Sequence, residues 1–116
     1  MAAPNIVNVT TIYGRTTPYT VTTTAATLVT NSVANSVYKI NTVMVTNNTG
    51  TGIGAYLEFY RSTTSYPIAY NVVVPAQSTV VLLAKDTAIY LEENDTLRIY
   101  GANTGLIATC SYEVIS

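Results

Sequence analysis

Short runs rich in valine, isoleucine, threonine and tyrosine recur along this sequence, and clusters of glycine, asparagine, serine and proline separate them. Such runs are typical of β-strands, and no convincing helical period accompanies them. We count about eight strands, with turns roughly every 8 to 12 residues, a spacing typical of β-sandwiches and jelly rolls. The chain of 116 residues suffices for one domain with one core. The sequence therefore predicts an all-β fold, a single antiparallel β-sandwich of the jelly-roll or immunoglobulin-like type.

The strand pattern is clearest in the middle of the chain. In the segment 53–60, apolar residues alternate with Tyr56, Glu58 and Tyr60, as expected of a strand with one buried face. The run 37–46 reads as the preceding strand, and the turn-forming residues 47–52 predict a hairpin between the two. Near the C-terminus, the alternating segments 95–101 and 106–115 flank a turn at 102–105 and predict a second hairpin.

The N-terminal third differs in texture from the rest. Residues 6–14 contain a plausible strand, whereas the threonine-rich segment 16–36 is weakly patterned and fits an arm, an edge strand or two short strands. We therefore assign residues 1–36 to an extended N-terminal arm or to edge strands of the same domain. Residues 37–116 are predicted to form the core of the sandwich.

The composition indicates a protein that is partly covered by neighbours. Charged residues make up 9% of the chain, against about 25% in ordinary soluble proteins, and ten residues are tyrosine, a type enriched at protein contacts. The run 80–84 is apolar on both faces, which predicts a strand covered on both sides, with another subunit as the second cover. The candidate contact residues are Ile6, Val7, Val9, Ile12, Tyr13, Tyr56, Tyr60, Val80 and Leu82.

The composition argues against several classes of function. The chain has no histidine, which excludes a serine triad and most zinc or copper sites, and its five basic residues are too dispersed to bind a nucleic acid backbone. The longest apolar run is far shorter than the roughly 18 residues that span a bilayer, and the first residues lack an export signal. We expect no enzyme activity, no cofactor, and neither nucleic acid nor membrane as partner. The single cysteine, Cys110, is expected to be a buried, inert thiol.

One acidic stretch has two interpretations. Glu92, Glu93 and Asp95 lie near Asp86 in the sequence, and carboxylates at such spacing could hold a hard cation such as calcium, although the spacing matches no known loop motif. The alternative is a tight structural turn over Glu93, Asn94 and Asp95. Asn94 tolerates a left-handed backbone, and Asp95 can accept hydrogen bonds from nearby amides. We favour the turn and predict no metal.

Four segments carry a resemblance to a known group of proteins: "APNIVNVTTIYG", "VYKINTVMVTN", "AKDTAIYLEENDTLRI" and the terminal "CSYEVIS". Together they cover much of the chain, which resembles small structural virion proteins of contractile-tailed marine cyanophages, that is, myoviruses. The resemblance implies a non-enzymatic component of the virion, which is assembled in the cytoplasm of the host cell.

Resemblance and composition together favour a capsid decoration or cement protein. Such a protein would form a homo-oligomer, with a trimer as our expectation, and would bind the major capsid protein or other virion proteins. One alternative is a structural component of the neck, tail or fibre. The other is a carbohydrate-binding module for host attachment, in which Tyr56, Tyr60 and Tyr100 would offer flat faces to sugars.

Overall fold

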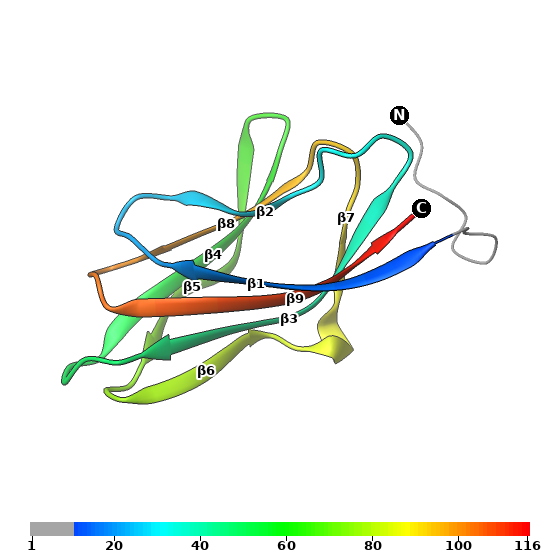
Figure 1. The fold of residues 1–116 in the computed structure, drawn as a ribbon. Helices are drawn as coiled ribbons and strands as arrows, with labels where there is room; N and C mark the ends of the chain where they lie inside the picture. Colours follow the sequence, from blue (N-terminus) through cyan, green and yellow to red (C-terminus); the bar gives the residue numbers. More distant parts are fainter. Residues whose placement is uncertain (1–10) are drawn as a thin grey trace.

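Strands make up most of the chain, and every pairing between them is antiparallel (Figure 1). The computed structural model describes residues 11–116. In this range the helical content is a single 3-10 turn, η2 (Lys85–Thr87). The strands are β1 (Ile12–Thr20), β2 (Ala26–Thr30), β3 (Val37–Asn47), β4 (Ile53–Arg61), β5 (Thr64–Val74), β6 (Ser78–Leu83), β7 (Ile89–Leu91), β8 (Thr96–Gly101) and β9 (Leu106–Ile115).

The strands form two sheets. Sheet A has the order β1-β9-β3-β6, and the short β7 also pairs with β3; sheet B has the order β2-β8-β4-β5. In Figure 1, sheet A lies in front of sheet B. The prediction of an all-β, antiparallel fold is confirmed, with nine strands in place of about eight, and the two sheets are consistent with a β-sandwich. The segment 11–36 contributes β1 and β2, one edge strand to each sheet.

Apolar side chains from both sheets form one buried cluster, which is the core of the domain. The alternation in β4 explains how sheet B contributes to it. Ala55 and Leu57 are fully buried, whereas Tyr56 and Glu58 lie on the opposite face and are only partly covered. The other large core residues that are completely buried include Ile40, Val43 and Val45 of β3, Leu97 and Ile99 of β8, and Leu106 of β9.

Both hairpins predicted from the sequence are wrong. Strand β3 lies in sheet A and β4 in sheet B, so residues 48–52 cross between the sheets, and β8 and β9 are likewise in different sheets. At the first crossing, the buried Asn47 side chain donates to the carbonyls of Thr51 and Val74 and accepts from the Thr49 N–H. These bonds satisfy backbone groups of the connecting segment and of the end of β5, which stabilises the crossing.

Strand β6 lies at the edge of sheet A, where one chain alone covers only its inner face. Val80 and Leu82 are half-buried and pack against the core, whereas Val81 between them is 52% exposed. The apolar run therefore has an inner face that belongs to the core and an outer face that is open. Cover of that outer face by another subunit, expected from the sequence, stays a prediction.

The hairpin of β4 and β5 projects from the rest of the fold (Figure 1), and its turn contains residues with unfavourable backbone angles. Ser62 and Thr63 have φ values of 51° and 62°, which a two-residue turn of this hand requires but which a β-branched residue adopts poorly. Asparagine and glycine are the residues that such turns prefer.

Replacing Ser62 and Thr63 together by Asn and Gly is expected to raise the free energy of unfolding by about 1 kcal/mol, because the strain at both positions is relieved. Urea unfolding at equilibrium measures this change. Thr23→Gly is the matched control, since Thr23 lies in an exposed bend without a positive φ and glycine there should destabilise the fold. Equal effects at the two sites would contradict the assignment of strain to the hairpin turn.

Candidate interaction surfaces and the acidic turn

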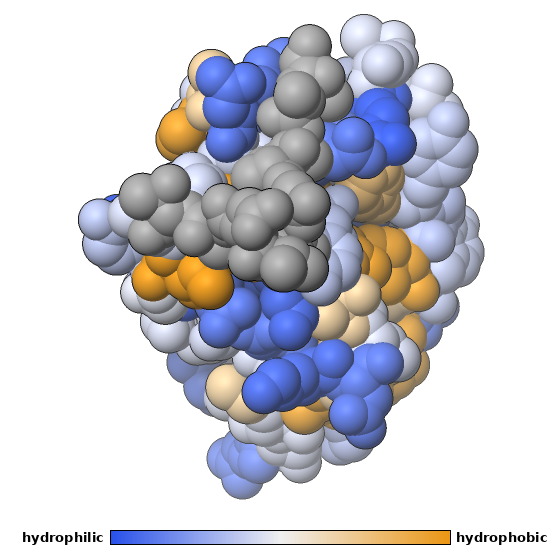
Figure 2. Space-filling view, turned by 90° about the vertical axis from the view of Figure 1, so that its right-hand side faces the viewer, coloured by the Kyte–Doolittle hydropathy of each residue, from blue (hydrophilic) through white to orange (hydrophobic). Residues whose placement is uncertain are grey.

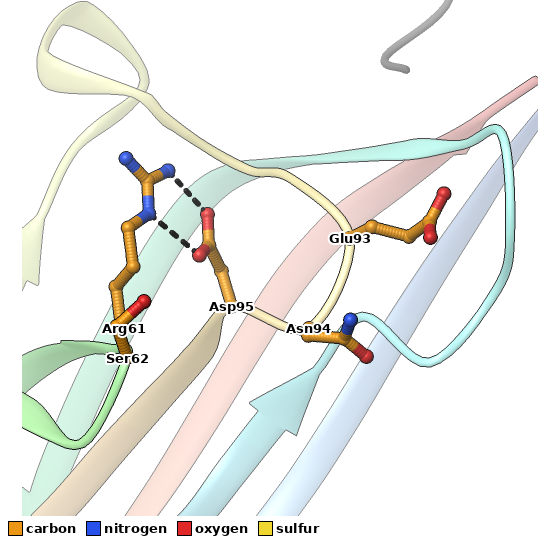
Figure 3. Close-up of a pocket in the computed structure, with 5 residues that line it drawn as sticks. All are labelled: Arg61, Ser62, Glu93, Asn94 and Asp95. Atoms are coloured by element: carbon orange, nitrogen blue, oxygen red, sulfur yellow. Dashed lines mark hydrogen bonds and ion pairs between the residues drawn. The ribbon is translucent and has the colours of Figure 1, made fainter. Parts of the chain in front are cut away.

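The acidic stretch forms the turn between β7 and β8 (Figure 3). Asn94 has a φ of 70°, the left-handed region that asparagine tolerates. Asp95 is almost completely buried, with 3% of its side chain exposed, and its Oδ2 accepts from the Glu92 N–H at 2.8 Å. The aspartate side chain thus closes the turn on its own backbone.

Arg61, at the end of β4, binds the same aspartate. Its Nε donates to Asp95 Oδ1 at 2.7 Å and its Nη2 to Oδ2 at 2.5 Å, a bidentate pair that Figure 3 shows from the side. Nη2 also lies 3.0 Å from Glu92 Oε2. The hydrogen bond with Asp95 raises the pKa of Arg61 above its usual value. This guanidinium therefore joins the projecting hairpin to the acidic turn.

The loop between β2 and β3 also attaches to this turn. The Asn31 N–H donates to the Asp95 carbonyl, the Asn94 N–H donates to the Asn31 carbonyl, and Glu93 Oε2 accepts from the Asn35 N–H at 2.8 Å. The buried side chain of Asn31 donates to the carbonyls of Ser36 and Leu91. The β2–β3 loop and the end of β4 are thus both hydrogen-bonded to the turn between β7 and β8.

A small cavity of about 240 Å³ lies beside the turn, lined by Arg61, Ser62 and residues 93–95 (Figure 3). Its carboxylates already have partners: Arg61 holds Asp95, and the Asn35 amide binds Glu93. Among residues 11–116, no group of three or more histidine, cysteine, aspartate or glutamate side chains is arranged to hold a metal ion. The geometry of the acidic turn is that of a structural corner.

Asp95→Ala is expected to lower the free energy of unfolding by about 2 to 3 kcal/mol, because it leaves the Glu92 N–H and the Arg61 side chain without their acceptor. Glu92→Ala is the matched control, since it removes a carboxylate that contacts the same arginine from an exposed position. Its cost should stay below about 1 kcal/mol. Similar losses in urea unfolding of both variants would contradict the special role of Asp95.

Tyrosine side chains gather on the outer face of sheet B. Tyr56 of β4 stacks on Tyr100 of β8, with ring centroids 4.5 Å apart and an interplanar angle of 2°. On the neighbouring strand β5, Tyr70 meets Tyr56 edge to face at 5.1 Å. Burial is the main cause that raises the pKa of Tyr100. We call Tyr56, Tyr70 and Tyr100 the tyrosine row.

A second set of contacts lies beside the tyrosine row. The Arg98 guanidinium stands over the Tyr60 ring at 4.4 Å and its Nε lies 3.6 Å from Glu58 Oε1. Tyr56 and Tyr60 are therefore half-buried by their own neighbours, and Tyr56 has an aromatic ring on each side. Tyr70, 73% exposed, is the member of the row most open to a partner, and the sequence analysis did not single it out.

Irregularities in β5 explain why the sequence pattern does not predict the exposure of Tyr70. The register between β4 and β5 shifts twice, between Ala55 and Leu57 and between Leu57 and Glu58, and Asn71 has a positive φ of 51°. Such bulges add residues to one strand and change which face the following side chains occupy. A regular alternation cannot predict the direction of Tyr70.

The remaining candidate contact residues lie at the start of the chain. Ile12 and Tyr13 are exposed on β1, the edge strand of sheet A. Ile6, Val7 and Val9 lie outside the described residues. Figure 2 views the end of the molecule near the termini, where hydrophobic residues are interspersed among hydrophilic ones.

Cys110 of β9 is completely buried. Burial raises the pKa of its thiol to about 12, from an ordinary value of 9.0, so the thiol stays protonated in the native state. The unfolded chain loses this proton first as the pH rises. The contribution of the thiol to stability is therefore complete below pH 9 and is lost between about pH 9 and 12.

Between pH 9 and 10, wild type is expected to lose about 1 kcal/mol more stability than Cys110→Ala, in which the tyrosines still titrate but the thiol is gone. Urea unfolding at the two pH values measures the difference. Parallel loss in both proteins would show that the thiol does not contribute.

No protein-family model and no curated protein matches this sequence. Several solved structures match this chain. A protein of Bacillus endospore appendages, which form a novel family of disulfide-linked pili, is 18% identical, with a TM-score of 0.57 over 100% of this chain and 96% of that one. The nucleoplasmin-like N-terminal domain of Drosophila FKBP39 is 14% identical, with a TM-score of 0.45 over 87% and 85% of the two chains.

The third is a pentameric capsid protein isolated from metagenomic phage sequences. It is 18% identical, with a TM-score of 0.46 over 84% of this chain and 60% of that one. The likeness to the appendage protein is one of fold alone. The other two, with TM-scores below 0.5, carry no argument about this chain. In the described residues, no helix is long and apolar enough to cross a membrane.

Proposed function

We propose that this protein is a non-enzymatic structural component of a phage virion, a capsid decoration protein that binds the shell as a homo-oligomer. The observation that carries the proposal is the apolar, weakly charged character of the surface. Ten large hydrophobic or aromatic side chains are exposed in the described part of a chain with only eleven charged residues. Such a surface favours association over dispersion.

The strand order supports a jelly-roll type of sandwich within this proposal. Without the short β7, the first strand pairs with the last (β1 with β9), the second with the next to last (β2 with β8), then β3 with β6 and β4 with β5. This is a long antiparallel hairpin rolled into two sheets, the arrangement of jelly rolls, which occur in viral capsid proteins among others. The fold is compatible with a shell component but does not define one.

The sequence resemblance to virion proteins of marine cyanophages supports the choice of another virion protein as the binding partner. In this proposal a trimer contacts the major capsid protein in the assembled virion, and the N-terminal residues with Ile6, Val7 and Val9 act as a clasp on a neighbouring sheet edge. The carbohydrate-binding alternative receives less support, since it needs open ring faces. Tyr56 is flanked by two rings, and Arg98 stands over Tyr60.

Particles that lack the protein should bind purified protein at hundreds of copies per particle, counted by quantitative mass spectrometry, because a decoration protein repeats with the shell lattice. A neck, tail or fibre component would bind in far smaller numbers. Deletion of residues 2–10 should lower the bound copy number if these residues form the clasp. Absence of binding by full-length protein would overturn the decoration proposal, and undiminished binding after the deletion would overturn the clasp alone.

A further inference from the structure

The charged residues are distributed unusually over the two sheets. The central strands β3, β4, β8 and β9 carry Lys39, Glu58, Arg61, Arg98 and Glu113. Among the strands at sheet edges, β1, β2, β5 and β6 carry Arg15 alone, and the short β7 carries no charge. The other five charges lie in η2 and in the acidic turn. Charge is thus concentrated where strands already have two neighbours.

This distribution is opposite to the usual protection of sheet edges. An edge strand has unpaired backbone groups, and soluble proteins commonly place charged side chains, especially lysine, on it to prevent pairing with other molecules. Here β5 has eleven residues and β6 six, and neither contains a charge. Edges without charge are compatible with a soluble protein when another surface covers them.

The exposed apolar side chains gather on the same strands. β5 and β6 form one side of the molecule, since they contact each other at the ends of their sheets, and they carry Tyr66, Ile68, Tyr70, Val73 and Val81. β1 and β2 contact each other on the opposite side, where Ile12 and Tyr13 are exposed. We call these the β5/β6 side and the β1/β2 side.

We infer that the β5/β6 side of one copy packs against the β1/β2 side of the next copy, so that the chains assemble head to tail. This inference rests on the proposed self-association and names its surfaces. The occupant is a second copy because these four strands carry no charge apart from Arg15, and because the two sides lie on opposite flanks of one chain, so that each copy offers both halves of the contact. A contact between two different sides gives a closed ring when the rotation between copies closes and an open filament when it does not.

Side chains rather than a long backbone ladder supply this contact. Pro18 of β1 and Pro67 of β5 lack an N–H donor, and β5 is interrupted by the two register shifts. A continuous sheet across the two copies is therefore restricted to short stretches. Val81 on the outer face of sheet A and Tyr70 on the outer face of sheet B flank the β5/β6 side, and with Tyr13 of β1 they supply apolar area without such a ladder.

The test uses a charge on each side of the full-length chain. Val81→Lys blocks the β5/β6 side, and Tyr13→Lys blocks the β1/β2 side. Each variant alone should be monomeric by light scattering under conditions in which wild type is oligomeric. An equimolar mixture should form a complex of two chains of 12.4 kDa each, because one intact side of each variant fits the intact side of the other. Misfolded chains would not complement in this way.

Thr109→Lys is the control. Thr109 lies on the central strand β9, where the same charge should leave the mass of the oligomer unchanged. Variants that stay oligomeric, or that become monomeric without pairing in the mixture, overturn the head-to-tail contact while self-association stands. A monomeric Thr109→Lys overturns it as well, because any added charge then suffices. A monomeric wild type overturns self-association itself, and particle binding is then judged separately from its own measurement.

Discussion

Leu57, Leu97 and Ile99 of sheet B are buried in the same cluster as Ile40 and Val45 of sheet A, and the rest of the structure depends on this contact. Since Cys110 is free and buried, the burial of apolar side chains between the two sheets is the main source of stability. The same contact determines which side chains lie on the outer faces of the two sheets. Each strand that gives one set of side chains to the core presents the alternate set outward, and so Tyr56 and Tyr100 lie outside.

Local patterns predicted the strands well, because alternation and turn composition act over a few residues. The faces of β4 and β8 follow directly from the spacing of Leu57, Leu97 and Ile99. Sheet membership depends on contacts that are distant in the sequence. A turn-rich segment such as 48–52 looks the same whether it returns to the same sheet or crosses to the other, and only the bonds of the buried Asn47 to Thr51 and Val74 distinguish the two.

The candidate sites show the same limit. The chemistry of Asn94 and Asp95 indicates a turn from the sequence alone, but the main partner of Asp95 is Arg61, 34 residues away, and no local signal points to it. The exposure of Tyr70 and Val81 depends on bulges and on the position of β5 and β6 at sheet edges, neither of which periodicity reveals. Composition, by contrast, indicates a surface with few charges but does not locate the exposed apolar side chains, since low charge is a property of the whole chain.

Two buried asparagines hold the segments that follow β2 and β3. The chemistry of their side-chain amides affects the chemical stability of the folded protein. Asn31 and Asn47 each donate two hydrogen bonds to backbone carbonyls and accept others through the same amide. Asparagine amides hydrolyse slowly to carboxylates, which have no N–H to donate. Loss of either amide would place a negative charge against two carbonyl oxygens inside the protein. Because both amides are buried and hydrogen-bonded in the folded chain, their hydrolysis has to await a local opening of these segments, so the rate at which the protein ages depends on how often the two loops open.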